Sequence, residues 1–182
     1  MIVDERIVTF INSLDTRNSE ILETIEKEAL ASSVPIIRRE MQSFLKTLLL
    51  IRKPMRILEV GTAVGFSALL MSEYAPEGCR ITTIENYEKR IPAALENFRR
   101  AGKEEKITLI EGDAAEVLKT LEGPYDFIFM DAAKGQYIHY LPDVLRLLGE
   151  DGCLVSDNVM QDGDVIESRF AVERRNRTIH AR

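Results

Sequence analysis

Apolar residues in the first fifty positions recur at spacings of three and four, which places them on one face of an α-helix. Phe44, Leu45 and Leu48 form one such set. The same spacing holds along three stretches: residues 4–14, 19–31 and 35–50. Each stretch is expected to form an amphipathic helix. The chain is therefore expected to begin with a helical preface, which we assign to residues 1–53.

From residue 56 onward the pattern changes to short apolar runs, separated by longer stretches with helical spacing. The short runs are RILEV, RITTIE, KITLIEG, YDFIFMD and GCLVSDN. The run FIFM is continuously apolar, which is typical of a strand buried on both faces. Strands that alternate with helices predict right-handed crossovers. The pattern thus indicates an α/β fold, with a doubly wound, mostly parallel sheet and helices on both faces.

The composition limits the classes of protein that the chain can represent. Its 182 residues, 45% of them hydrophobic, fit one globular domain with a single core. The net charge of −6 argues against nonspecific coating of nucleic acid, which needs many basic side chains, although a local basic patch stays open. Cys79 and Cys153 are too few for a disulfide framework, and no apolar run is long enough to cross a bilayer. We expect a single cytoplasmic domain, residues 1–182, without a membrane partner.

Oxygen-bearing side chains stand at the end of each predicted strand. They are Glu59, Glu85, Asp113, Asp131, and the pair Asp157 and Asn158. The carboxyl ends of parallel strands share one rim of the sheet and form its ligand crevice, so these groups are expected to converge there. The alternative is that each acid caps the following helix, which suits Asp113 well but suits Glu59 and Glu85 poorly, because Glu is a weak N-cap.

Two glycines, Gly61 and Gly65, follow the first predicted strand. Glycine lets the backbone approach a ligand closely or adopt a positive φ. The dinucleotide fingerprint GxGxxG is absent because Ala63 stands at its second glycine. Glu85 ends the next strand, where a carboxylate can accept the hydroxyl protons of a ribose. The arrangement indicates an adenosine site without phosphates; a tight turn with close helix packing is the alternative for the glycines.

Five stretches together resemble a known family: ILEVGTAVGFSA, TTIE, EGDAAEVL, FIFMDAAKGQY and LVSDNV. They resemble the class I S-adenosylmethionine-dependent O-methyltransferases of the cation-dependent group, which includes catechol and caffeoyl-CoA O-methyltransferases. The resemblance covers about residues 30 to 160 and implies a Rossmann-like core over residues 54–182. Within the group, VPIIRRE and DAAKGQY are most similar to bacterial enzymes that methylate 5-hydroxyuridine at the tRNA wobble position.

The resemblance implies a role for each of these rim residues. The S-adenosylmethionine residues would be Glu59, Gly61, Gly65, Ser67, Glu85, Asp113, Ala114 and Asp131. The metal ligands would be Asp131, Asp157 and Asn158. Such a set suits Mg²⁺, which prefers hard oxygen ligands and commonly takes one or two carboxylates, although Mn²⁺ and Ca²⁺ stay open. A bound cation would lower the pKa of the acceptor hydroxyl.

Lys134 would be the general base, with its pKa lowered by the nearby metal cation and the sulfonium of the cofactor. The alternative is an exposed lysine in a loop that contains Gly135.

Binding of tRNA would need basic side chains that contact its phosphates. The candidates are Arg38, Arg39, Arg169, Arg174, Arg175, Arg177 and Arg182. A run of charged residues usually forms only a solvent-exposed surface, which is the alternative for these arginines.

The resemblance thus implies a tRNA acceptor, with residues 1–53 contributing an acceptor lid; a small catechol-like acceptor is the alternative. The family's sheet normally ends in an antiparallel hairpin, whereas this chain stops at Arg182, so we expect the hairpin to be missing. A missing hairpin would expose a sheet edge, and a homodimer is expected on that ground. Two other classes stay open: an NAD-dependent dehydrogenase and a noncatalytic protein that binds S-adenosylmethionine.

Overall fold

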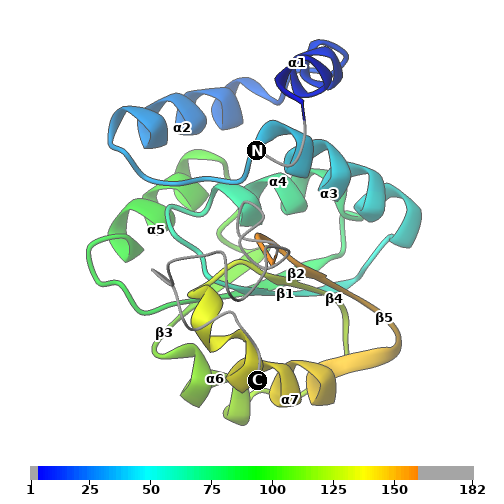
Figure 1. Ribbon diagram of the computed structural model, residues 1–182. Helices are drawn as coiled ribbons and strands as arrows, with labels where there is room; N and C mark the ends of the chain where they lie inside the picture. Colours follow the sequence, from blue (N-terminus) through cyan, green and yellow to red (C-terminus); the bar gives the residue numbers. More distant parts are fainter. Residues whose placement is uncertain (1–3, 160–182) are drawn as a thin grey trace, which may run out of the picture.

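The computed structural model describes residues 4–159. This part of the chain contains one parallel five-stranded sheet with helices around it (Figure 1). The strands are β1 (Arg56–Val60), β2 (Arg80–Glu85), β3 (Ile107–Glu111), β4 (Tyr125–Met130) and β5 (Leu148–Ser156). Their order across the sheet is β3-β2-β1-β4-β5, and each neighbouring pair is parallel. The order reverses between β1 and β4, where ligands of such sheets bind. The predicted α/β class and doubly wound sheet are confirmed.

Helices cover both faces of the sheet (Figure 1). On one face lie α4 (Phe66–Tyr74) and α5 (Ile91–Arg100), and on the other lie α6 (Ala114–Thr120) and α7 (Tyr137–Leu147). Strand residues alternate between the two cores, so Ile57 packs with the first layer and Leu58 with the second. A cluster of buried apolar side chains thus lies on each face of the sheet, and this packing holds in place the strand ends that carry the candidate site.

Three helices make up the predicted preface: α1 (Glu5–Ser13), α2 (Glu20–Ala31) and α3 (Arg39–Arg52). Leu22 of α2 and Leu45 of α3 are fully buried in the core that also contains α4, so these two helices extend one layer of the fold. The helix α1 buries none of its residues. None of the helices within residues 4–159 is long and apolar enough to cross a membrane.

The helix expected over residues 35–50 begins later, at Arg39. Ile37 is instead buried in the core, and its backbone carbonyl accepts a hydrogen bond from the side-chain Nε2 of Gln42 at 3.1 Å. Residues 35–38 thus lie outside the helix and form a wall of the pocket described below. The expected absence of the C-terminal hairpin concerns residues outside the described range, as do the five arginines from Arg169 to Arg182.

Candidate active site

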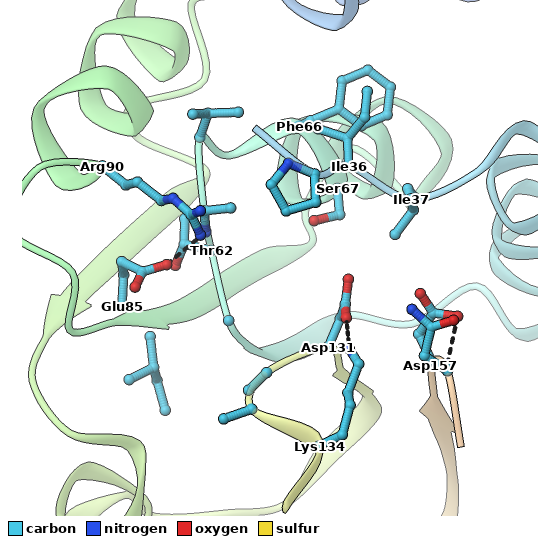
Figure 2. A pocket seen from close by; sticks show the side chains of 18 of the residues that line it. Ile36, Ile37, Thr62, Phe66, Ser67, Glu85, Arg90, Asp131, Lys134 and Asp157 are labelled. Atoms are coloured by element: carbon cyan, nitrogen blue, oxygen red, sulfur yellow. Dashed lines mark hydrogen bonds and ion pairs between the residues drawn. The ribbon is translucent and has the colours of Figure 1, made fainter. Parts of the chain in front are cut away.

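A cavity of about 940 Å³ opens at the carboxyl ends of the strands, beside the point where their order reverses. Its lining comes from residues within 35–44, 61–67, 84–90, 112–114, 131–134 and 157–158, together with Tyr140. Figure 2 shows acidic side chains from three strand ends in one view, with Glu85 on one side and Asp131 and Asp157 on the other. The predicted convergence of strand-end groups is therefore seen for Glu85, Asp131, Asp157 and Asn158, whereas Glu59 and Asp113 do not line the cavity.

The two glycines after β1 have different surroundings. Gly61 lines the cavity with φ at +103°, and a Cβ there would overlap the main-chain carbonyl of Asp131. Gly65 has φ at +81°, and a Cβ there would overlap the ring of Phe98 in α5. The alternative interpretation, close helix packing, therefore accounts for Gly65, which is absent from the cavity lining. Contact of either glycine with a cofactor stays a prediction.

Glu59 lies fully buried below the cavity, and no part of it belongs to the lining. Its carboxylate accepts hydrogen bonds from the hydroxyls of Ser67 and Thr83, each at 2.5 Å. The hydroxyls of Thr62 and Thr83 lie 2.6 Å apart and share a hydrogen bond in which either can be the donor. Because Ser67 and Thr62 line the cavity, the network connects Glu59 to its floor.

Burial raises the pKa of Glu59 to about 8, although both hydroxyl hydrogen bonds oppose the shift. The native protein thus keeps this proton up to about pH 8, whereas the unfolded chain loses it near pH 4.5. Between these values the unfolded state binds fewer protons, so this group makes stability fall as the pH rises.

We predict that Glu59→Gln removes this pH dependence. Relative to the variant, the wild type is expected to lose about 1 kcal/mol of unfolding free energy per pH unit between pH 5.5 and 7.5. Urea unfolding at three pH values measures the difference, with the exposed Glu105→Gln as the control. Parallel stability curves for Glu59→Gln and the wild type would show that Glu59 is ionised throughout.

Glu85 lines the cavity at the end of β2, and its carboxylate is held by the backbone. Its Oε2 accepts from the backbone N–H of Ala63 at 2.7 Å, and Oε1 accepts from Asn86 at 3.1 Å and Tyr87 at 2.9 Å. A carboxylate offers about four acceptor positions, so a lone pair of Oε2 stays available for a ligand hydroxyl. The side chain is oriented before any ligand arrives.

Asp113 and Ala114, both predicted to bind the cofactor, have different positions relative to the cavity. Asp113 is exposed and accepts from the backbone N–H of Ala115 at 2.8 Å, which makes it the N-cap of α6. It is absent from the cavity lining, whereas Ala114 and Gly112 line the cavity. Helix capping, the alternative considered for Asp113, therefore accounts for this side chain.

Asp131 and Asp157 follow the neighbouring strands β4 and β5, and both line the cavity. Burial raises the pKa of Asp157, and the negative charge of Asp131 raises it further. Asn158 also lines the cavity, and its backbone N–H donates to Asp157 Oδ1 at 2.8 Å. Residues 4–159 contain no cluster of three His, Cys, Asp or Glu side chains arranged for a metal. The predicted set has two carboxylates and an amide, and two half-buried carboxylates that repel each other suit a divalent cation.

Lys134 lies in the cavity wall, and its ammonium forms an ion pair with Asp131 (Figure 2). Burial lowers the pKa of Lys134, but the hydrogen bond and charge of Asp131 outweigh it and raise the pKa above its ordinary value. The alternative was an exposed loop lysine, and Lys134 is instead half-buried, with 24% of its side chain accessible. Its role as a base stays a prediction.

Several residues that build the site were missed by the sequence interpretation. Thr62 and Thr83 complete the network around Glu59, while Arg90 and Tyr140 line the cavity. Thr62 could have been suggested by its place beside Gly61 at the end of a strand. Arg90 and Tyr140 carry no such signal, because each lies several residues beyond its strand end.

The chain matches the family model described as O-methyltransferase over residues 12–181. A catechol O-methyltransferase from Niastella koreensis is 35% identical over 128 residues, which cover 68% of this chain and 58% of the relative. A caffeoyl-CoA O-methyltransferase from Stellaria longipes is 29% identical over 165 residues, covering 84% and 67% respectively. The chain spans only about half the length of its catechol O-methyltransferase relative from Mycobacterium tuberculosis, namely 51%.

Solved structures agree with this match. The SAH-bound methyltransferase PaMTH1 from Podospora anserina has a TM-score of 0.84 and 32% identity, covering 89% of this chain and 72% of that chain. The O-methyltransferase TomG from Streptomyces achromogenes, in complex with SAM, has a TM-score of 0.81 and 26% identity, covering 93% and 80%. The resemblance inferred from the five sequence stretches is confirmed at the level of the family. Because the family model spans nearly the whole chain and the fold agrees with it, this chain belongs to the O-methyltransferase family.

Proposed function

We propose that this chain is an S-adenosylmethionine-dependent and divalent-cation-dependent O-methyltransferase, whose acceptor is a small catechol-like molecule. One observation carries the proposal: a single cavity has an oriented carboxylate, Glu85, at one side and the pair Asp131 and Asp157 at the other. The first fits an adenosine and the second fits a cation with two acceptor oxygens. A methyl group transferred between two such ligands needs both in one cavity.

The cofactor half of the cavity fits S-adenosylmethionine. Glu85 retains an acceptor lone pair for a ribose hydroxyl, and Gly112 and Ala114 leave room beside it for a flat base. Ser67, with its hydroxyl on Glu59, would face the methionine end. Similar structures that hold SAH or SAM support this choice of cofactor. No pyrophosphate cradle of the GxGxxG type precedes α4, which argues against the NAD-dependent dehydrogenase.

The cation would be held by Asp131, Asp157 and the amide oxygen of Asn158. When bound, it would lower the pKa of an acceptor hydroxyl and hold two vicinal oxygens in place. The protein's own contribution is to keep the two carboxylates on adjacent strand ends and to shield them from water. Ile36 and Ile37 lie across the cavity from Asp131 and Asp157 and form part of that shield (Figure 2).

Lys134 can accept a proton only if Asp131 has another cationic partner. In its present pairing the lysine is an ammonium, because Asp131 stabilises the charged form. Once another cation neutralises Asp131, the half-buried position of Lys134 favours its neutral form. The proton of the acceptor hydroxyl would then pass to Lys134 Nζ as the oxygen attacks the methyl group, and the bond from that methyl group to the sulfonium sulfur would break, which leaves S-adenosylhomocysteine.

The choice of a small acceptor has two supports. The cavity wall opposite the strand ends includes the apolar side chains of Ile36, Ile37, Met41 and Phe44, which suit an aromatic ring. The named relatives include catechol and caffeoyl-CoA O-methyltransferases. A tRNA acceptor bearing 5-hydroxyuridine stays a prediction. Of its phosphate-binding candidates, Arg39 is paired with Glu23 and Glu26, at 3.4 and 2.8 Å, and Arg38 lines the cavity.

A methyl-transfer assay tests the proposal directly. The chain is given labelled S-adenosylmethionine with either a catechol or tRNA that carries 5-hydroxyuridine, each with and without a chelator. We expect methylated catechol in the presence of Mg²⁺, and loss of product with the chelator. Faster methylation of tRNA than of catechol would show that tRNA, not a catechol, is the preferred acceptor. Product formation despite the chelator would show that the reaction does not need a cation. Binding of S-adenosylmethionine without any methyl transfer would favour the noncatalytic alternative.

A further inference from the structure

Tyr137 lies outside the cavity lining but makes contacts directly below the proposed cation site. It is the first residue of α7 and follows the short 3₁₀ helix η1 (Lys134–Gln136). Its hydroxyl donates to the main-chain carbonyl of Met130 at 3.0 Å, and the carbonyl of Asp157 lies 3.3 Å away. A phenol has one proton, so the shorter contact to Met130 is the principal bond and the other shares it.

The Met130 carbonyl joins the two strand ends that carry the acids. It accepts a hydrogen bond from the backbone N–H of Asp157 at 3.0 Å, in addition to the one from Tyr137. Met130 is bonded through its peptide to Asp131, so this carbonyl connects the backbones of both acidic residues. Its two acceptor positions are then both used. The Tyr137 hydroxyl therefore fastens the loop after β4 to the point where β4 and β5 meet.

We propose that Tyr137 is a positioning residue for the cation site, because its hydroxyl fixes the placement of Asp131 relative to Asp157. This inference rests on the proposed function, in which the two carboxylates share one cation. Mg²⁺ demands nearly ideal geometry from its ligands, so a small change in carboxylate separation weakens binding. Groups that orient metal ligands typically affect metal affinity by 10- to 100-fold when they are removed.

The ring of Tyr137 has a separate contact that the test must preserve. Lys134 Nζ lies 5.6 Å from the ring centroid, within the range of a cation–π interaction. Phenylalanine keeps this ring and loses only the hydroxyl. Tyr137→Phe therefore keeps the packing of the ring, while it removes the hydrogen bond of the hydroxyl to Met130 together with its interaction with the Lys134 ammonium.

The test measures Mn²⁺ binding by calorimetry, without any methyl acceptor. We expect the Kd of Tyr137→Phe to be about 10-fold weaker than that of the wild type, with its S-adenosylmethionine affinity unchanged. Tyr125→Phe is the matched control. Tyr125 is also buried, but it lies at the opposite end of β4. There the guanidinium carbon of Arg56 is 4.6 Å from the centroid of its ring. The control is expected to bind Mn²⁺ with the wild-type affinity.

The outcomes separate this inference from the proposed function. Equal Mn²⁺ affinity for Tyr137→Phe and the wild type would overturn the positioning role and leave the cation site intact. Weaker binding by both variants, in proportion to a lower melting temperature, would also overturn it, since general loosening would be the cause. A wild-type chain that binds no Mn²⁺ would overturn the cation site and the inference together.

Discussion

Replacing Asp157 by alanine is expected to lower methyl transfer to a catechol by about 100- to 1000-fold while S-adenosylmethionine remains bound. This is the usual loss when one group that stabilises charge at a reacting centre is removed. Asp157 is one of only two carboxylates proposed for the cation, and it shares its end of the cavity with Asp131. Glu85, which would hold the ribose, belongs to β2 on the other side of β1. Cofactor binding and catalysis should therefore separate.

Two measurements on the same samples check this expectation. Calorimetry gives the affinity for S-adenosylmethionine, and initial rates at saturating cofactor give the turnover. Asp143→Ala is the control, because it removes the same charge from an exposed salt bridge of α7, with Arg146 at 3.2 Å, outside the cavity lining. Turnover of Asp157→Ala within threefold of the wild type would show that Asp157 is not needed for the reaction. A loss of S-adenosylmethionine affinity in Asp157→Ala but not in Asp143→Ala would show that Asp157 helps to bind the cofactor.

The position of the site could be predicted from the sequence because it depends on a rule of chain topology. Continuous apolar runs such as FIFM identify buried strands, and parallel strands place their carboxyl ends on one rim. Glu85 ends its strand, Asp131 and Asp157 come directly after theirs, and all three line one cavity. Knowledge of the strand ends was sufficient, since the sheet brings together residues that lie far apart in the chain.

The depth and partners of individual side chains could not be predicted in this way. Glu59 is the second-last residue of β1, and two hydroxyls bind its carboxyl group below the cavity. Asp113 has the same residue type as Asp131, yet it turns toward the first N–H groups of α6. Arg39 was a candidate for binding phosphate, but its guanidinium donates a hydrogen bond to Glu26, 13 residues earlier in the chain. Such choices depend on which partner the fold brings near, and sequence spacing does not contain that information.

Gly61 connects the fold to the site more directly than any other residue of the turn after β1. Its φ of +103° lies in a region that residues with a Cβ rarely adopt. The missing side chain also leaves room for the carbonyl of Asp131, whose backbone N–H donates to Val60 at 3.0 Å. A larger residue would have to push β4 away from β1 at the point where Asp131 enters the cavity.

We therefore predict that Gly61→Ala destabilises the protein by about 3 to 5 kcal/mol, from backbone strain together with overpacking against main-chain atoms that cannot rotate away. Gly102→Ala is the matched control, because Gly102 also has a positive φ, of +62°, but has nothing within 4 Å of the added Cβ. Strain alone should cost the control about 1 kcal/mol. Urea unfolding followed by circular dichroism measures both variants, and a Gly61→Ala chain that is unfolded without urea agrees with the prediction. Equal losses of stability in the two variants would mean that the turn can move away from Asp131, and the close approach of β1 and β4 would then not be what requires glycine at this position.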